Sequence, residues 1–84
     1  MVTVFDVAVY ILKRLKKLSS VKLQRLCYYT QAWYLVWEDE PLFEEEFYAW
    51  EFGPICKELY AATEEKFMLK PKDLPGDDSR LTEV

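Results

Sequence analysis

The side chains whose types could most clearly do chemistry are a run of carboxylates that lie between residues 38 and 51. Two neighbouring carboxylates can act as a general acid and base, and a set of them can bind calcium. Their spacing here matches no EF-hand loop, so a solvated acidic surface is the more economical interpretation. The run contains Glu38, Asp39, Glu40, Glu44, Glu45, Glu46 and Glu51.

Nucleophilic and metal chemistry are restricted by the residue types that the sequence lacks. It contains no histidine, so neither a Ser-His nor a Cys-His nucleophile pair can form. Without histidine, Cys27 and Cys56 cannot complete a four-ligand zinc site of the usual kind, and they are expected to be a reduced pair. Gly53 and Gly76 are the only glycines, too few for a Gly-rich phosphate loop. We therefore expect no enzyme, no catalytic, cofactor-binding or metal-binding residues, and no cofactor.

Length and composition indicate one globular domain. The 84 residues are 51% hydrophobic and 17% aromatic, which is too apolar for a disordered chain. A net charge of −4 disfavours nucleic acid and anionic membranes as partners. The longest apolar run, residues 26–37, is shorter than the ~20 residues that cross a bilayer. With no signal-peptide pattern before Asp6, we expect a cytoplasmic protein.

Hydrophobic periodicity predicts two long helices in the first half of the chain. Residues 4–17 have the apolar stripe of an amphipathic helix that ends near Leu18, and Thr3 and Asp6 can form a capping box at its start. A second helix is expected from about Val21 to Trp37. Its second half is apolar nearly all round, which indicates burial on several sides.

The second half of the chain predicts an extended segment and a third helix. Side chains alternate from Phe47 to Phe52, which fits a short strand. Gly53 and Pro54 are then expected to open a helix, because proline at the first helical position loses no hydrogen bond. This helix would run to about Lys66, and its inner stripe would consist of Ile55, Leu59 and Ala62.

These elements predict a mainly α-helical fold: a small domain of three helices with one short extended segment before Gly53. The domain would occupy residues 1–69, and residues 70–84 would form a polar loop followed by the start of a missing helix. We therefore expect the chain to be truncated at its C-terminus. Apolar surface exposed by that truncation would favour self-association.

Charged and aromatic residues are unevenly distributed along the chain. Every charged residue between Val7 and Trp37 is basic, and every one between Leu26 and Ile55 is acidic. A bipolar surface of this kind orients a charged protein partner, although the two faces can also neutralise each other or only solvate the domain. Eleven of the fourteen aromatic residues lie between positions 28 and 60, more than a three-helix core of this size can hide. Part of this group can form a partner-binding face or pack against further helices.

One combined pattern, KLQ-LxYYxQAW followed by AWxxGP, is specific enough to compare with known families. It lies in residues 21–33 and 49–55, with the string PLF at residues 41–43 between them. This pattern resembles the SocA-like, or Panacea, antitoxin domain family, which includes phage-associated GepA-type proteins. Residues 4–12 are similar to the opening helix of the family, so the resemblance covers residues 3 to about 62. Cys27 stands where the family commonly has an apolar residue.

The resemblance implies an antitoxin: a small helical domain that binds and neutralises a toxin encoded beside it. Some relatives are thought to act as adaptors that hand the toxin to a protease. On physical grounds we expect the fold to depend on Trp33, Trp50, Gly53 and Pro54, and truncation of Trp33 to unfold the domain. The candidates for partner binding are Lys22, Arg25, Tyr28, Gln31 and Tyr48.

Two other classes of function stay open at this point. One is a small helical DNA-binding or autoregulatory module that would place the basic residues 13–25 on phosphate groups. Steep salt dependence of duplex binding would favour it, and the acidic pI near 4.8 counts against it. The other is a phage-encoded host-modulating protein that has no toxin partner.

Overall fold

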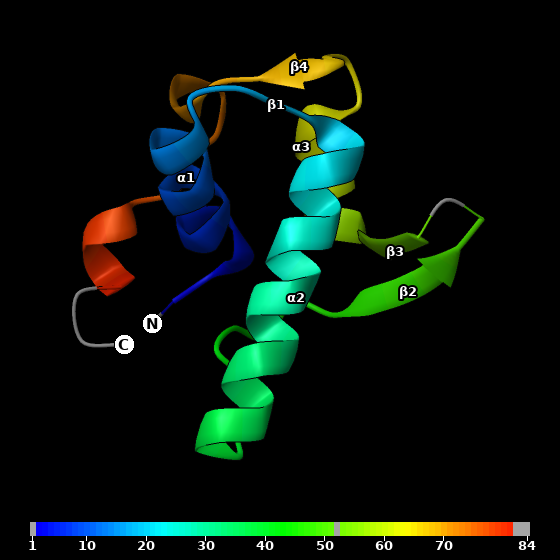
Figure 1. Ribbon diagram of the computed structural model, residues 1–84. Helices are drawn as coiled ribbons and strands as arrows, with labels where there is room; N and C mark the ends of the chain where they lie inside the picture. Colours follow the sequence, from blue (N-terminus) through cyan, green and yellow to red (C-terminus); the bar gives the residue numbers. More distant parts are fainter. Residues whose placement is uncertain (1, 52, 82–84) are drawn as a thin grey trace.

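Three α-helices form the frame of the described residues. The computed structural model describes residues 2–51 and 53–81 (Figure 1). Helix α1 (Val4–Leu15) and the longer α2 (Ser20–Glu38) run in opposite directions, and the short α3 (Lys57–Thr63) packs against α2. Within the described residues, no helix has both the length and the apolar composition that crossing a bilayer requires.

Two small antiparallel sheets complete this frame, so the fold is mainly helical, as predicted, but contains more strand than the sequence indicated. Strand β1 (Leu18–Ser19) pairs with β4 (Met68–Leu69). Strand β2 (Phe47–Trp50) pairs with β3 (Gly53–Cys56) in a hairpin that projects from α2 (Figure 1).

Helix α1 begins as the sequence predicts and ends earlier. The backbone N–H of Thr3 donates to Asp6 Oδ2 at 2.8 Å, and the N–H of Asp6 donates to Thr3 Oγ1 at 3.4 Å, which confirms the capping box. The predicted end near Leu18 is wrong. Lys16 turns the chain with a φ of 73°, and Leu18 enters β1, where its side chain is buried.

Helix α2 has nearly the predicted bounds, but its burial differs from the prediction. Ser19 caps it by accepting from the N–H of Lys22 at 3.2 Å, and Asp39 ends it in the left-handed conformation. The buried residues lie in its first half. Its second half was expected to be buried on several sides, yet the side chains of Val36 and Trp37 are 78% and 73% exposed. That half extends past the end of α1, and no other described helix lies beside it in Figure 1.

The third helix is present, but its predicted start at Gly53 is wrong, because Gly53 and Pro54 belong to β3. They face Trp50 and Ala49 across the hairpin. An extended segment needs a partner for its backbone groups, and proline is tolerated in a sheet of two strands, where both strands are edges. Gly53 has a φ of 124°, which side-chain-bearing residues rarely adopt.

Helix α3 therefore starts only at Lys57, and its inner face differs from the predicted stripe. Leu59 and Thr63 are its buried residues, whereas Ala62 is exposed and Ile55 lies in β3.

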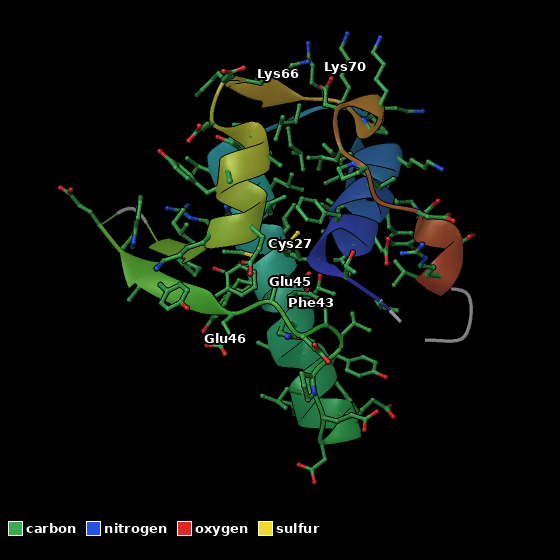
Figure 2. The ribbon with its side chains drawn as sticks, turned by 180° about the vertical axis from the view of Figure 1, so that it is seen from behind. Cys27, Phe43, Glu45, Glu46, Lys66 and Lys70 are labelled. Carbon is green, nitrogen blue, oxygen red and sulfur yellow. The ribbon has the colours of Figure 1, made fainter. Side chains whose placement is uncertain are left out.

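Buried apolar side chains from both halves of the chain form one core. Helix α1 contributes the largest share, and Figure 2 shows Cys27 and Phe43 in the centre of the molecule. Leu74 belongs to this core, so part of the expected polar loop packs with the domain. The core consists of Val4, Val7, Ala8, Val9, Leu12, Leu18, Leu23, Cys27, Phe43, Cys56, Leu59, Leu69 and Leu74.

Two glutamines of α2 fix extended segments against the helix. Gln24 is buried; its Oε1 accepts from the N–H of Cys56 at 2.9 Å, and its Nε2 donates to the carbonyl of Cys56 at 3.2 Å. Two turns later, Gln31 Oε1 accepts from the N–H of Leu42, and its Nε2 donates to the carbonyl of Phe43, both at 2.8 Å. Each amide satisfies one backbone donor and one backbone acceptor, so the two side chains hold β3 and the segment before β2 in place.

The C-terminal segment is attached to α1. It contains the 3-10 helices η1 (Pro71–Asp73) and η2 (Asp78–Leu81). The N–H of Asp77 donates to Oδ1 of the buried Asp6 at 2.8 Å, and a Cβ on Gly76 would overlap the carbonyl of Phe5. The predicted start of a missing helix at residues 81–84 falls largely on residues 82–84, outside the described residues.

Candidate protein-binding site

The β2–β3 hairpin and the adjoining sides of α2 and α3 carry a cluster of aromatic and basic side chains. We call this cluster the hairpin face and define it by Arg25, Tyr28, Tyr48, Trp50 and Lys57. The three aromatic residues line a surface hollow of about 420 Å³ together with Phe47, Ala49, Gly53 and Pro54 of the hairpin. All five residues are exposed, and the exposed fraction of Trp50 is 52%.

Contacts between side chains fix the rings of the hairpin face. The Tyr28 ring meets the half-buried Phe47 edge-on, with 5.4 Å between centroids. The Trp50 ring lies 5.6 Å from that of Tyr60, which joins the hairpin to α3. Lys57 Nζ lies 4.5 Å from the centroid of the Tyr48 ring, within range of a cation–π interaction. Rings held in this way lose little conformational entropy when a partner covers them.

Gly53 lets Arg25 lie close to the hairpin. A Cβ at position 53 would be 3.4 Å from Arg25 Nε, so the guanidinium group lies next to the glycine. Arg25 and Lys57 give the hairpin face two cationic groups beside its aromatic rings. Tryptophan, tyrosine and arginine are the residue types that contribute most to protein–protein affinity.

The structure brings together three of the five predicted partner-binding residues: Arg25, Tyr28 and Tyr48. Lys22 is exposed in the first turn of α2; like Arg25 it does not line the hollow, but Arg25 lies against Gly53 of the hairpin. Gln31 has a different role from the predicted one, because both polar groups of its side chain bind backbone of the segment before β2. Lys57 was not among the partner-binding residues predicted from the sequence. Only the hairpin pairing, unseen in the sequence, brings Lys57 to Tyr48.

A second apolar surface, which the sequence analysis did not identify, lies between the two long helices. We call it the α1–α2 groove; its volume is about 780 Å³. Trp33 and Trp37 stack along it with 6.3 Å between centroids and 12° between ring planes. The excess of aromatic residues was the signal available in the sequence. The groove is lined by Val7, Tyr10, Ile11, Arg14, Leu15, Leu26, Tyr29, Thr30, Trp33, Tyr34, Trp37, Glu38, Leu42 and Leu81.

The expected burial of Trp33 is wrong, since its side chain is 63% exposed. We now expect Trp33→Ala to keep the fold and to lower the free energy of unfolding by less than about 1.5 kcal/mol, the value of a ring–ring contact. Leu23→Ala, at a fully buried position of the same helix, should cost about 2–5 kcal/mol. Urea unfolding followed by circular dichroism measures both. Equal losses for the two variants would contradict the assignment of Trp33 to the surface.

The two cysteine thiols have low reactivity. Both are free thiols and fully buried. Burial raises the pKa of Cys27 far above its ordinary value and that of Cys56 to about 11. Such thiols stay protonated at neutral pH and are poor nucleophiles. In the described part of the chain, no three Cys, Asp or Glu side chains gather as metal ligands. The exposed groups of both surfaces are rings and charges, which suit noncovalent recognition.

Comparison with known proteins gives one match. Residues 23–83 match the family described as "Antitoxin SocA-like, Panacea domain", which covers more than half of the chain and includes the whole hairpin face. No curated protein and no solved structure matches the chain.

Proposed function

Because the chain belongs to the SocA-like antitoxin family with the Panacea domain, we propose that it neutralises a cognate toxin by binding it directly, with the hairpin face as the contact surface. The family match supports an antitoxin-like role in general. The choice of surface rests on one observation: exposed Arg25, Tyr28, Tyr48 and Trp50 converge there from two separate parts of the chain.

The frame under the hairpin face suits a binding surface. The Gln24 side chain ties the end of β3 to α2, and the ring of Trp50 contacts α3. A preformed surface of this kind avoids the cost of ordering side chains at the moment of binding. Inhibition would then follow from covering the toxin, with no chemical step by this chain.

Charge indicates the complementary surface. Lys57 is cationic and exposed beside the Tyr48 ring, so the toxin surface that fits the hairpin face carries a carboxylate next to apolar area that can cover the tyrosine rings. Pairing of this kind speeds encounter and selects among partners more than it raises affinity.

The test is growth rescue in a host that expresses the neighbouring gene product under an inducible promoter. That product alone should arrest growth, and co-expression of this chain should restore it. Purified together, the two proteins should form a complex of fixed stoichiometry. A neighbouring product that is not toxic, or toxicity that the folded chain does not relieve, would contradict the proposal.

Two variants test whether the toxin binds at the hairpin face. Arg25→Glu and Tyr48→Ala should each weaken toxin binding about tenfold or more while circular dichroism stays unchanged, because both residues are exposed members of the cluster. Lys72→Glu makes the same charge change as Arg25→Glu but lies in η1, far from the hairpin in Figure 1, so it should bind normally. If Lys72→Glu weakens binding as much as Arg25→Glu, only net charge matters and the surface is misassigned.

A proteolytic-adaptor form of this role would use the same complex and present the bound toxin to a protease. The toxin half-life in cells separates the two forms: it shortens when an adaptor is present and stays the same or lengthens under inhibition by covering alone.

A further inference from the structure

The α1–α2 groove has the shape and composition of a helix-packing site. The residues of α2 that line it include Leu26, Thr30, Trp33 and Trp37, spaced by four, three and four positions. This spacing forms a continuous seam along a helix, as in coiled coils and helical bundles. From residue 26 to residue 38 the seam is about 18 Å long, enough for three turns of an added helix.

The two ends of the groove carry opposite charges. Arg14 lines the end near the C-terminus of α1, where the exposed Lys16 and Lys17 follow it. Glu38 lines the other end, at the C-terminus of α2, where the exposed Asp39 and Glu40 follow it. An occupant helix must therefore present acidic groups at the first end and basic groups at the second.

We propose that the occupant is a second copy of this chain, related to the first by a two-fold axis, with the second half of α2 from each copy packed antiparallel in the groove of the other. In this arrangement Glu38 of each copy lies at the Arg14 end of its partner, so both ends are neutralised at once. Trp33 and Trp37, which stand exposed in the single chain, become the side chains that fill the opposing groove.

Self-complementarity favours a second copy over the toxin as the occupant. An interface with two-fold symmetry uses the same patch twice, so it must contain both members of each pair of unlike charges, as this groove does. In Figure 1 the hairpin projects from the side of α2 that faces away from α1, and its hollow shares no lining residue with the groove. The dimer would thus leave both toxin-binding surfaces open.

Sedimentation velocity of the chain alone over a range of concentrations tests the proposal without any toxin, so its failure is separate from that of the proposed function. A reversible monomer–dimer equilibrium is expected. Arg14→Glu and Glu38→Arg should each raise the dimer dissociation constant about tenfold, because every lost pair occurs twice. The double variant should restore it to within about threefold of the unmodified chain, since the pair is re-formed with reversed signs.

Aromatic variants give an independent readout. Trp37→Ser should raise the dissociation constant about 100-fold or more, whereas Trp50→Ser, a matched change on the hairpin face, should leave it unaltered. A chain that stays monomeric up to about 1 mM, which excludes any tighter dissociation constant, overturns the proposal. So does a dimer that Trp37→Ser leaves intact, or a double charge variant that associates no better than the single ones.

Discussion

Gln24→Leu is expected to lower the free energy of unfolding by about 2–6 kcal/mol, because it leaves the N–H and the carbonyl of Cys56 buried without partners, at about 1–3 kcal/mol each. The side chain of Gln24 is 3% exposed, so water cannot replace the lost amide. A chain of 84 residues has a total stability of about 4–12 kcal/mol, so this single change can unfold a large fraction of the molecules.

Gln31→Leu is the matched comparison. Gln31 makes the same pair of backbone hydrogen bonds with Leu42 and Phe43, but it is only half-buried, so water can satisfy part of what is lost. Its cost should be about 1–2 kcal/mol. Urea unfolding followed by tryptophan fluorescence compares the two. Equal costs, or a Gln24→Leu protein as stable as the unmodified chain, would show that the Gln24 hydrogen bonds do not support the hairpin.

Asp6→Asn should destabilise the domain by about 2–3 kcal/mol at neutral pH, the value of a hydrogen bond to a buried charged group. Burial alone would raise the pKa of Asp6. The backbone N–H groups of Asp77 and Thr3 and the charge of Arg80, 3.6 Å away, outweigh burial and hold this pKa below its ordinary value. The carboxylate thus stabilises the folded state only while it is ionised.

The sign of the pH effect follows from that lowered pKa. The contribution of Asp6 is fully present above the unfolded-state pKa of about 4, and it is lost as the pH falls through the folded-state value. Melting temperatures measured from neutral to about pH 2 should therefore converge for the unmodified chain and Asp6→Asn. Asp77→Asn, at an exposed carboxylate, is the control and should have a smaller effect at neutral pH. A gap between Asp6→Asn and the unmodified chain that stays constant down to pH 2 would contradict this role.

Local signals in the sequence were sufficient where one segment determines its own structure. The capping box of Thr3 and Asp6 needs only residues three positions apart, and the bounds that periodicity predicts for α2 lie within one residue of the observed ones. The extended segment at residues 47–50 follows from alternation. These predictions depended on backbone chemistry within a few residues, which a sequence shows directly.

Predictions failed where a distant segment decides the outcome. Gly53 and Pro54 suit a helix start and an edge strand equally well, and pairing with residues 47–50 selects the strand. Trp33 looks buried by its type, but in Figure 1 no other described helix lies beside the second half of α2. Gln31 looks like a surface residue until the chain returns at residues 42–43 to bind its amide.

The bounds of the family match differ from those of the packed core. The match begins at residue 23, yet α1, which precedes it, supplies five of the buried apolar residues, including the fully buried Val4 and Leu12. Two segments inside the match depend on α1: Glu45 accepts from the N–H of Val4 at 3.1 Å, and Asp77 donates to Asp6. A chain cut at residue 23 would therefore lose its core as well as its first helix.

Because Cys27 and Cys56 are buried, alkylation of their thiols can measure how often the folded domain opens. One thiol belongs to α2 and the other to the end of β3, and both are fully shielded and protonated at neutral pH. An alkylating reagent can reach them only when the helix and the hairpin separate. The rate of alkylation at each position therefore reports how often these two elements separate in the native ensemble, and no residue has to be changed to measure it.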